Sequence, residues 1–94
     1  MFILQIEHPV RNYEMWKKAF DGDPIGRKRN GVQRHRVLRS TDKLDYAIVE
    51  LEFLTATEAQ HMLNALKKLW GQVEGTLIDS VQARIVEVTE EVKY

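Results

Sequence analysis

Cysteine is absent from the chain, and its basic and acidic residues balance at a formal net charge of zero. The lack of cysteine excludes disulfides, thiolate nucleophiles, iron–sulfur clusters and cysteine-based zinc sites. No apolar run approaches the roughly 20 residues of a membrane-spanning helix, and no basic segment precedes the apolar N-terminal stretch, as one would in a secretory signal. A net charge of zero provides no overall field that attracts nucleic acid or an anionic membrane surface. We therefore expect a cytoplasmic protein that engages neither nucleic acid nor membrane.

The composition is that of one globular domain. The chain has 94 residues, of which 44% are hydrophobic and 30% charged, a balance typical of folded proteins. A chain of this length forms one core, so residues 1–94 are predicted to be a single domain. Basic residues concentrate in the first half and acidic residues in the second, which favours pairing of the halves within one chain or between two copies.

The first quarter of the chain predicts a strand followed by a helix. Residues 2–8 alternate as a strand does, and Pro9 ends the run. Asn12 is a suitable N-cap for a helix whose apolar side chains, the last of them Phe20, recur at helical spacing.

A break and a restart are expected in this helix. Gly22 interrupts the helical pattern, and Asp23 followed by Pro24 is typical of a new N-cap with proline at the first helical position. The second piece is predicted to run for about two turns, until Asn30 and Gly31 end it.

The second half contains the clearest helix signals. Thr55 and Glu58 form a capping box, apolar residues then recur every three or four positions, and Gly71 is expected to end the helix. Strands are predicted over residues 32–39, 46–53 and 81–88, with a loop through Gly75 before the last of them. In this β-α-β-β-α-β order, right-handed crossovers place both helices on one face of an antiparallel sheet. The predicted fold class is therefore α+β, in a ferredoxin-like arrangement with a four-stranded sheet.

Alternation in the third predicted strand sorts its side chains onto two faces. The apolar ones share the face that must meet the helices: Ala47, Val49, Leu51 and Phe53. A register that pairs Val37 with Val49 sets Arg36 opposite Glu50, whereas a one-residue slip would set arginines against leucine and valine. The far face then carries Arg34, Arg36, Ile48, Glu50 and Glu52. We predict this mixed face to be the interface of a homodimer; the alternative is a solvated outer face with cross-strand ion pairs.

Two histidines are the candidate catalytic residues. By the alternation of their strands, His8 and His35 both point into the layer between sheet and helices, where a neutral imidazole can bind, orient or deprotonate a ligand. The alternative is a structural histidine that bonds to backbone or lies at the edge of the sheet. His61 falls off the apolar stripe of the second helix and is expected to be exposed. The histidines match no metal-site template, so we expect neither a metal nor another cofactor.

The ligand-binding candidates are aromatic and basic. Tyr13, Trp16 and Trp70 belong first to the core, yet two tryptophans in a small helical layer can also line a site for an aromatic ligand. Arg27 lies in a basic segment, residues 26–31, that would contact an anionic ligand at the mouth of a cleft. The alternative for this segment is a solvated helix end, where cations are favoured near the negative end of the helix dipole.

Residues spread over nearly the whole chain form one pattern: His8-Pro9-Val10, Tyr13, Trp16, Phe20-Asp21, Arg27, Gly31-Val32, Val37, Arg39-Ser40, Asp42 and Glu52-Phe53. This pattern resembles small bacterial proteins of the dimeric α/β-barrel superfamily, which includes the antibiotic biosynthesis monooxygenase-like proteins. The resemblance implies a homodimer whose two sheets form a barrel, with a ligand cleft between each sheet and its helices. Cofactor-free monooxygenases of this superfamily oxidise polyaromatic phenols in that cleft, and this is the activity that the resemblance implies. Haem-degrading relatives use an asparagine on the first strand and a histidine on the second helix. On its first strand this chain has Gln5 and Glu7 instead of an asparagine, and on its second helix His61 lies off the buried stripe.

Two functions of different kinds fit these observations. The first is a homodimer that binds a small aromatic or apolar molecule in the helix–sheet cleft, as a cofactor-independent monooxygenase-like enzyme. The second is a non-catalytic dimer with a structural or interaction role, and the sequence leaves the choice between them open. An RNA-binding module of the same element order is disfavoured, because Ile48 takes a base-stacking position and Glu50 and Glu52 would repel phosphate.

Overall fold

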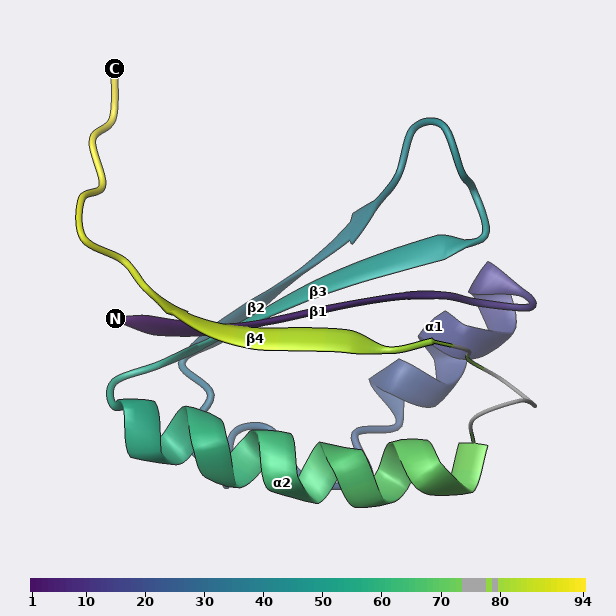
Figure 1. Ribbon diagram of the computed structural model, residues 1–94, viewed down its shortest axis with the longest axis horizontal. Helices are drawn as coiled ribbons and strands as arrows, with labels where there is room; N and C mark the ends of the chain where they lie inside the picture. The colour runs from purple at the N-terminus through teal and green to yellow at the C-terminus, as the bar shows by residue number, and fades with distance from the viewer. Residues whose placement is uncertain (74–77, 79) are drawn as a thin grey trace.

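The computed structural model describes residues 1–73, 78 and 80–94, and it shows two helices on one side of a four-stranded sheet (Figure 1). Along the chain the elements are β1 (Phe2–Pro9), α1 (Tyr13–Asp21), β2 (Arg34–Arg39), β3 (Tyr46–Phe53), α2 (Ala56–Val73) and β4 (Gln82–Glu87). The loop that we expected through Gly75 lies outside the described residues. Neither of these two helices is long and apolar enough to cross a membrane.

The sheet is antiparallel, and its strand order is β2-β3-β1-β4. The first and third strands of the chain therefore lie in the middle, and β2 and β4 form the edges. Both helices cover the same face, as Figure 1 shows. This is the predicted ferredoxin-like α+β arrangement, in which each half of the chain contributes one helix that returns to the sheet.

The predicted register between β2 and β3 is confirmed. Val37 lies opposite Val49 and Arg36 opposite Glu50, and Arg36 Nε donates to Glu50 Oε1 at 3.1 Å. Opposite charges therefore face each other on one side of the sheet, and valines face each other on the other side. A slip by one residue would exchange the two faces of β2 and destroy both sets of contacts.

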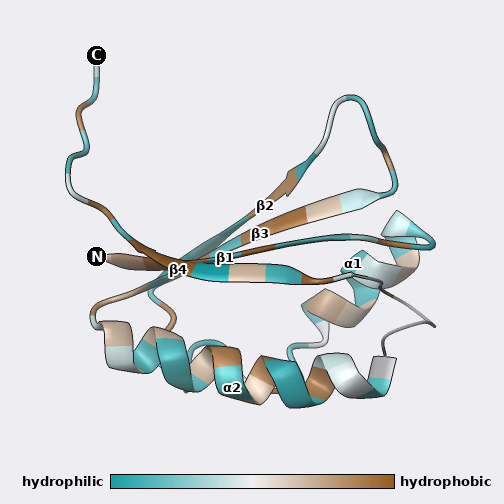
Figure 2. Ribbon diagram, in the orientation of Figure 1, coloured by the Kyte–Doolittle hydropathy of each residue, from teal (hydrophilic) through white to brown (hydrophobic). Residues whose placement is uncertain are grey.

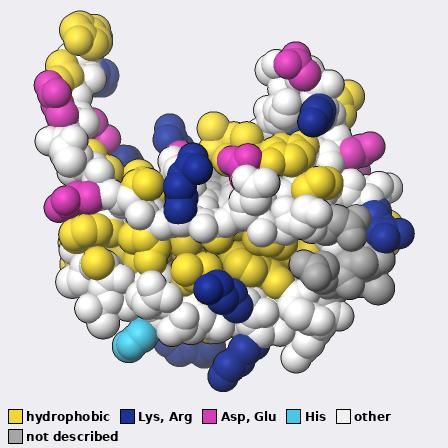
Figure 3. Space-filling model, in the orientation of Figure 1, with side chains coloured by type: hydrophobic (Ala, Val, Ile, Leu, Met, Phe, Trp, Pro, Cys, Tyr) yellow, Lys and Arg dark blue, Asp and Glu magenta, His cyan; other side chains and the backbone are white. Residues whose placement is uncertain are grey.

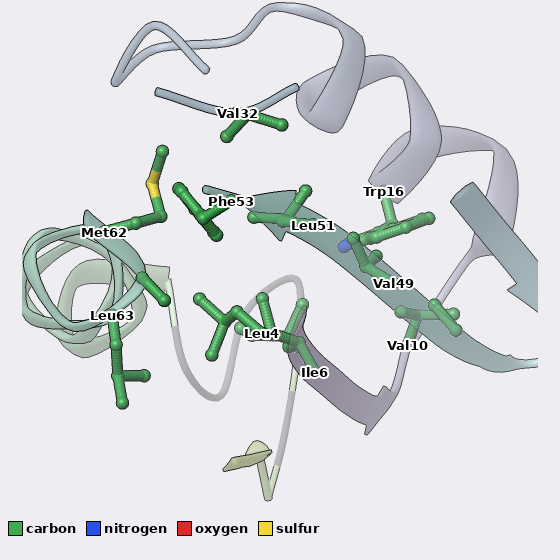
Figure 4. Close-up of a cluster of buried hydrophobic side chains, with 13 residues drawn as sticks. Leu4, Ile6, Val10, Trp16, Val32, Val49, Leu51, Phe53, Met62 and Leu63 are labelled. Carbon is green, nitrogen blue, oxygen red and sulfur yellow. The ribbon is translucent and has the colours of Figure 1, made fainter. Parts of the chain in front are cut away.

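The core lies between the helix-facing side of the sheet and one side of α2. Its largest fully buried side chains are Leu4, Leu51, Phe53 and Met62. Figure 4 shows Met62 approaching from α2 and Trp16 from α1, at opposite ends of a row of β3 side chains. Figure 2 shows hydrophobic and hydrophilic residues interspersed along the strands and along α2, because only one side of each element faces the core.

The start of α2 follows the predicted cap, but its end does not follow the predicted stop. Thr55 Oγ1 accepts a hydrogen bond from the backbone N of Glu58 at 3.1 Å, and the Thr55 hydroxyl lies 3.1 Å from Glu58 Oε1. The helix passes Gly71 and ends at Val73. Gly71 does not adopt a positive φ, so it is a helical residue of low helix propensity and not a stop.

The second helical piece predicted between Asp23 and Gly31 is wrong, because this segment forms hydrogen-bonded turns. Asp23 has a φ of 50° and Gly26 a φ of 86°, left-handed values that a right-handed helix does not include. Asp23 still caps a turn, since its Oδ1 accepts from the backbone N of Arg27 at 2.8 Å. The chain therefore turns sharply after α1 instead of continuing as a second helix.

The face of the sheet away from the helices carries a hydrogen-bonded row that crosses all four strands. Arg84 Nε donates to Gln5 Oε1 at 2.9 Å, Gln5 Nε2 donates to Glu50 Oε2 at 3.2 Å, and Arg36 continues the row from β2. We call this surface the open face. All five residues predicted for a dimer interface lie on it or at its edge, and the residues after β4 and the loop between β2 and β3 rise on either side of it (Figures 1 and 3).

The buried side of β3 gives the first testable prediction. Replacing Phe53, which is fully buried, by alanine removes a large side chain from the core and is expected to lower the free energy of unfolding by about 3–5 kcal/mol. Chemical denaturation measures this loss. The neighbouring Leu54 is 60% exposed, so Leu54→Ala is the matched control, with an expected change below about 0.5 kcal/mol. Equal losses in both variants would contradict the assigned orientation of β3.

Candidate functional site

A cleft of about 160 Å³ lies between the helix-facing side of the sheet and the two helices. Ile6, Val49 and Leu51 of the central strands line it on the sheet side, and Leu66 and Trp70 line it from α2. Residues of the turn after α1 also line it, among them Pro24 and Ile25. Figure 3 shows hydrophobic side chains gathered in a band between the sheet and α2, where the two layers meet at the edge strand β4. The cleft is therefore mainly apolar and open to solvent on one side.

Aromatic rings attach α1 to the sheet and make one end of the cleft. Trp16 packs edge-on against His8 of β1 with ring centroids 5.6 Å apart and stacks on Phe20 at 5.4 Å. Tyr13 packs on the other side of Trp16 at 5.7 Å. The helical spacing of these side chains puts them on one side of α1, as the periodicity predicts. Because the rings are large, they hold the helix backbone away from the sheet and leave the cleft beside them.

His8 is a buried polar group in this apolar lining. The residue is 2% exposed, and its Nδ1 lies 3.1 Å from the carbonyl oxygen of Pro9. A carbonyl only accepts, so Nδ1 carries the proton in the neutral ring and Nε2 is left as the acceptor. Burial lowers the pKa of His8 below the ordinary value of 6.5, more than the bond to Pro9 raises it. The imidazole is therefore neutral at physiological pH.

The free nitrogen of His8 reaches the cleft. Every buried side-chain nitrogen and oxygen in the described part of the chain has a hydrogen-bond partner. His8 makes its hydrogen bond through Nδ1, so Nε2 is not sealed inside the core. His8 also lines the cleft, so its imidazole lies where it can contact a ligand that occupies the cleft.

Arg27 and Asp23 are the charged residues of the lining that the structure describes. Arg27 Nη1 donates to the carbonyl oxygen of Phe20 at 2.9 Å, and its guanidinium carbon lies 4.0 Å from the centre of the Phe20 ring. The Nε of Arg27 lies 3.7 Å from Asp23 Oδ1, an ion pair without a hydrogen bond of normal length. The guanidinium is thus held in place by backbone and aromatic contacts.

The structure brings together most of the predicted site residues, but not all of them. His8, Trp16, Trp70 and Arg27 line the cleft. Tyr13 does not line it; it supports Trp16 from behind and lies 4.2 Å under the guanidinium of Arg39.

The predicted face of His35 is confirmed, but the residue is not enclosed between the sheet and the helices. His35 faces the helix side of the sheet, where it is exposed and does not line the cleft. It lies on the edge strand β2, where its ring meets the edge of Phe20 at 5.3 Å. Two aromatic rings, Phe20 and Trp16, connect it to His8, so the histidines do not act as a pair in direct contact. His61 is exposed, as expected.

Phe20 and Asp23 are lining residues that the sequence reasoning did not place in the site. Phe20 was assigned only to the helix, and Asp23 only to a helix cap. The signal available for Asp23 was its position four residues before Arg27, a spacing at which an acid and a base meet across one turn. Among the described residues, no group of three or more His, Cys, Asp or Glu side chains lies close enough to hold a metal ion.

No protein-family model and no curated protein matches the chain, but solved structures do. SnoaB from Streptomyces nogalater, a cofactor-independent oxygenase, is 14% identical, with a TM-score of 0.78 over 99% of this chain and 97% of its own. A protein from Nitrosomonas europaea with the provisional description antibiotic biosynthesis monooxygenase is 17% identical, with a TM-score of 0.72 over 96% of this chain and 100% of its own. A dimeric ferredoxin-like protein from an uncultured marine organism is 15% identical, with a TM-score of 0.73 over 97% of both chains.

Likeness at this level of identity concerns the fold, and it agrees with the resemblance noted from the sequence. TM-scores of 0.72 to 0.78 over 96–99% of this chain show that it shares its overall fold with these three neighbours. The chain therefore has the ferredoxin-like fold that is found in dimeric ferredoxin-like proteins and in antibiotic biosynthesis monooxygenase-like proteins.

Proposed function

We propose that the protein is a homodimeric small-molecule-binding enzyme of the cofactor-independent oxygenase type, acting on a small aromatic substrate in the helix–sheet cleft. The observation that carries this proposal is a neutral, buried histidine, unprotonated at Nε2, in the lining of a mainly apolar cleft. A base in a mainly apolar, aromatic-lined cleft is suited to removing a proton from an aromatic ligand. A fold neighbour described as a cofactor-independent oxygenase supports the reaction class.

The volume of the cleft sets the size of the ligand. An engineered apolar cavity of about 150 Å³ binds benzene, so a cleft of about 160 Å³ accommodates one aromatic ring, and a second fused ring can extend toward the open side. Trp16 and Trp70 provide flat walls for such a ligand. Mono- and bicyclic phenols are the substrates that this space fits best.

The proposed reaction needs dioxygen as its co-reactant. With α-naphthol as an example, Nε2 of His8 takes the hydroxyl proton, and the resulting anion supplies the electrons that reduce dioxygen. A carbon–oxygen bond forms at the ring carbon para to the hydroxyl, the oxygen–oxygen bond breaks, and that carbon loses its hydrogen. Naphthol and dioxygen are thereby converted to 1,4-naphthoquinone and one molecule of water. His8 returns its proton to the departing water and is restored.

The open face supports the homodimer. It combines a hydrogen-bonded polar row with apolar side chains that a monomer leaves in contact with water, Ile48 partly and Leu38 at 37% exposure. A self-complementary surface with both kinds of side chain is typical of an interface between two copies related by a two-fold axis. Two neighbours of the same fold are described as dimeric.

The role of His8 as base makes the second prediction. His8→Gln keeps a polar side chain of similar size but removes the basic nitrogen, so oxygen consumption with α-naphthol is expected to fall by about 10²-fold or more. An oxygen electrode and quinone absorbance measure the rate. His61→Gln is the matched control, because that histidine is exposed on α2.

The pH dependence of the same reaction follows from the lowered pKa of His8. Protonated His8 cannot accept a proton, so the rate is expected to be constant at neutral pH and to fall toward acid with a midpoint below 6.5. A midpoint at or above that value would contradict the assignment of His8 as the base.

Tight binding of naphthol by the wild type without oxygen consumption would favour the alternative function, the non-catalytic dimer.

The third prediction concerns assembly. Ile48→Lys adds two like charges to a two-fold interface, one from each copy, and is expected to convert a dimer to a monomer at micromolar concentration in sedimentation analysis. Gln60→Lys adds the same charge on the exposed side of α2 and should leave the dimer intact. A wild-type protein that sediments as a monomer would refute the homodimer.

A further inference from the structure

We propose that Arg27 is a specificity-determining residue that selects aromatic ligands carrying a carboxylate. This inference deepens the proposed function, since it assumes that the cleft takes a small aromatic ligand. It assigns the class of that ligand as a monocyclic aromatic acid, with its ring between the tryptophans and its carboxylate at the turn that follows α1.

The guanidinium of Arg27 has unused donors at the cleft. The side chain is 18% exposed, so it is less hydrated than a free surface arginine. It donates one hydrogen bond, from Nη1 to the carbonyl oxygen of Phe20, out of the five N–H donors that a guanidinium carries. The Phe20 ring lies 4.0 Å below it and fixes its plane. A planar, partly desolvated guanidinium with free donors is the group that binds a carboxylate through two parallel hydrogen bonds.

Asp23 does not occupy those donors. Its Oδ1 accepts from the backbone N of Arg27 at 2.8 Å, while the distance from the same oxygen to Nε of Arg27 is 3.7 Å. The Asp23 side chain is 35% exposed, about twice as much as that of Arg27, so water screens its charge more strongly. The cation therefore dominates the field that a ligand meets inside the cleft, and Asp23 reduces it without cancelling it.

The other polar group of the lining is compatible with an acidic ligand. His8 is neutral, because burial lowers its pKa, so it neither attracts nor repels a carboxylate. The remaining lining that the structure describes is apolar, apart from backbone. The guanidinium repels a ligand cation, whereas it donates hydrogen bonds to a ligand anion. The cleft therefore discriminates in favour of the anion.

The fourth prediction uses a matched pair of probes, 4-ethylbenzoate and 4-ethylbenzamide, which share a ring and shape but differ in charge. Calorimetry on the wild-type protein is expected to show about tenfold tighter binding of the acid than of the amide. Both tryptophans of the chain line the cleft, so quenching of intrinsic fluorescence reports whether each probe binds there.

Two substitutions should move this preference in opposite directions. Arg27→Gln removes the cation and is expected to abolish the tenfold preference while leaving the affinity for the amide within about twofold. Asp23→Asn removes the competing anion and should increase the preference. Asparagine tolerates the positive φ of this position and keeps an oxygen for the backbone N of Arg27, so the turn is preserved in this variant. Lys28→Gln removes a neighbouring charge that does not line the cleft and should leave the preference unchanged.

The outcomes separate this inference from the proposed function. Equal binding of acid and amide by the wild type, or an unchanged preference in Arg27→Gln, overturns the role of Arg27 and leaves the aromatic cleft standing. An equal loss of preference in Lys28→Gln overturns it as well, because general surface charge would then explain the effect. If neither probe binds or quenches fluorescence, the proposed aromatic cleft itself is refuted and the inference falls with it. Asp23→Asn, which conserves the turn, keeps the test valid even if Arg27→Gln fails to fold.

Discussion

The two-residue alternation of β3 is the constraint on which both faces of the molecule depend. β3 pairs with β1 on one side and with β2 on the other, so its register fixes the orientation of side chains on all three strands. Val49 and Leu51 thereby form the floor of the cleft, while Glu50 between them joins the row on the open face. Shifting β3 by one residue would bury its glutamates under the helices and expose the floor of the cleft. This shift is unfavourable because the buried glutamates would have no partners for their charges.

The cleft exists because α1 packs through large rings. Well-packed interiors leave few voids larger than a water molecule, so a space of about 160 Å³ needs something that keeps the layers apart. Trp16 and Phe20 do this, since each is wider than the leucines by which α2 meets the sheet. Smaller side chains at these two positions would let α1 approach the sheet and fill the cleft. Packing would then improve, but the ligand site would be lost.

The sequence predicts the parts of the fold that depend on local periodicity, and it fails where tertiary position decides. The register of β2 on β3 follows from matching charges with charges and valine with valine, and it was predicted correctly. Alternation also gives the correct face for His35, but alternation does not reveal that β2 lies at the edge of the sheet, where that face is not covered by a helix. Asp23 and Pro24 are residue types typical of a helix start, yet the positive φ at Asp23 and Gly26 shows that the chain turns there instead. The four-residue spacing of Asp23 and Arg27 allowed for their contact, but the turn that places both in the cleft lining is known only from the structure.

The burial of His8 argues for a functional site more strongly than the cleft does by itself. An apolar residue at this position would fit the surrounding core without the cost of burying an imidazole. The bond from Nδ1 to Pro9 offsets part of that cost, but it leaves Nε2 without a partner at the surface of the cleft. A purely structural histidine satisfies both nitrogens or turns the second one to bulk water. Here His8 lines a space bounded mainly by tryptophan and aliphatic side chains, so in the proposed function a hydroxyl or acidic hydrogen of the ligand would be the partner of Nε2.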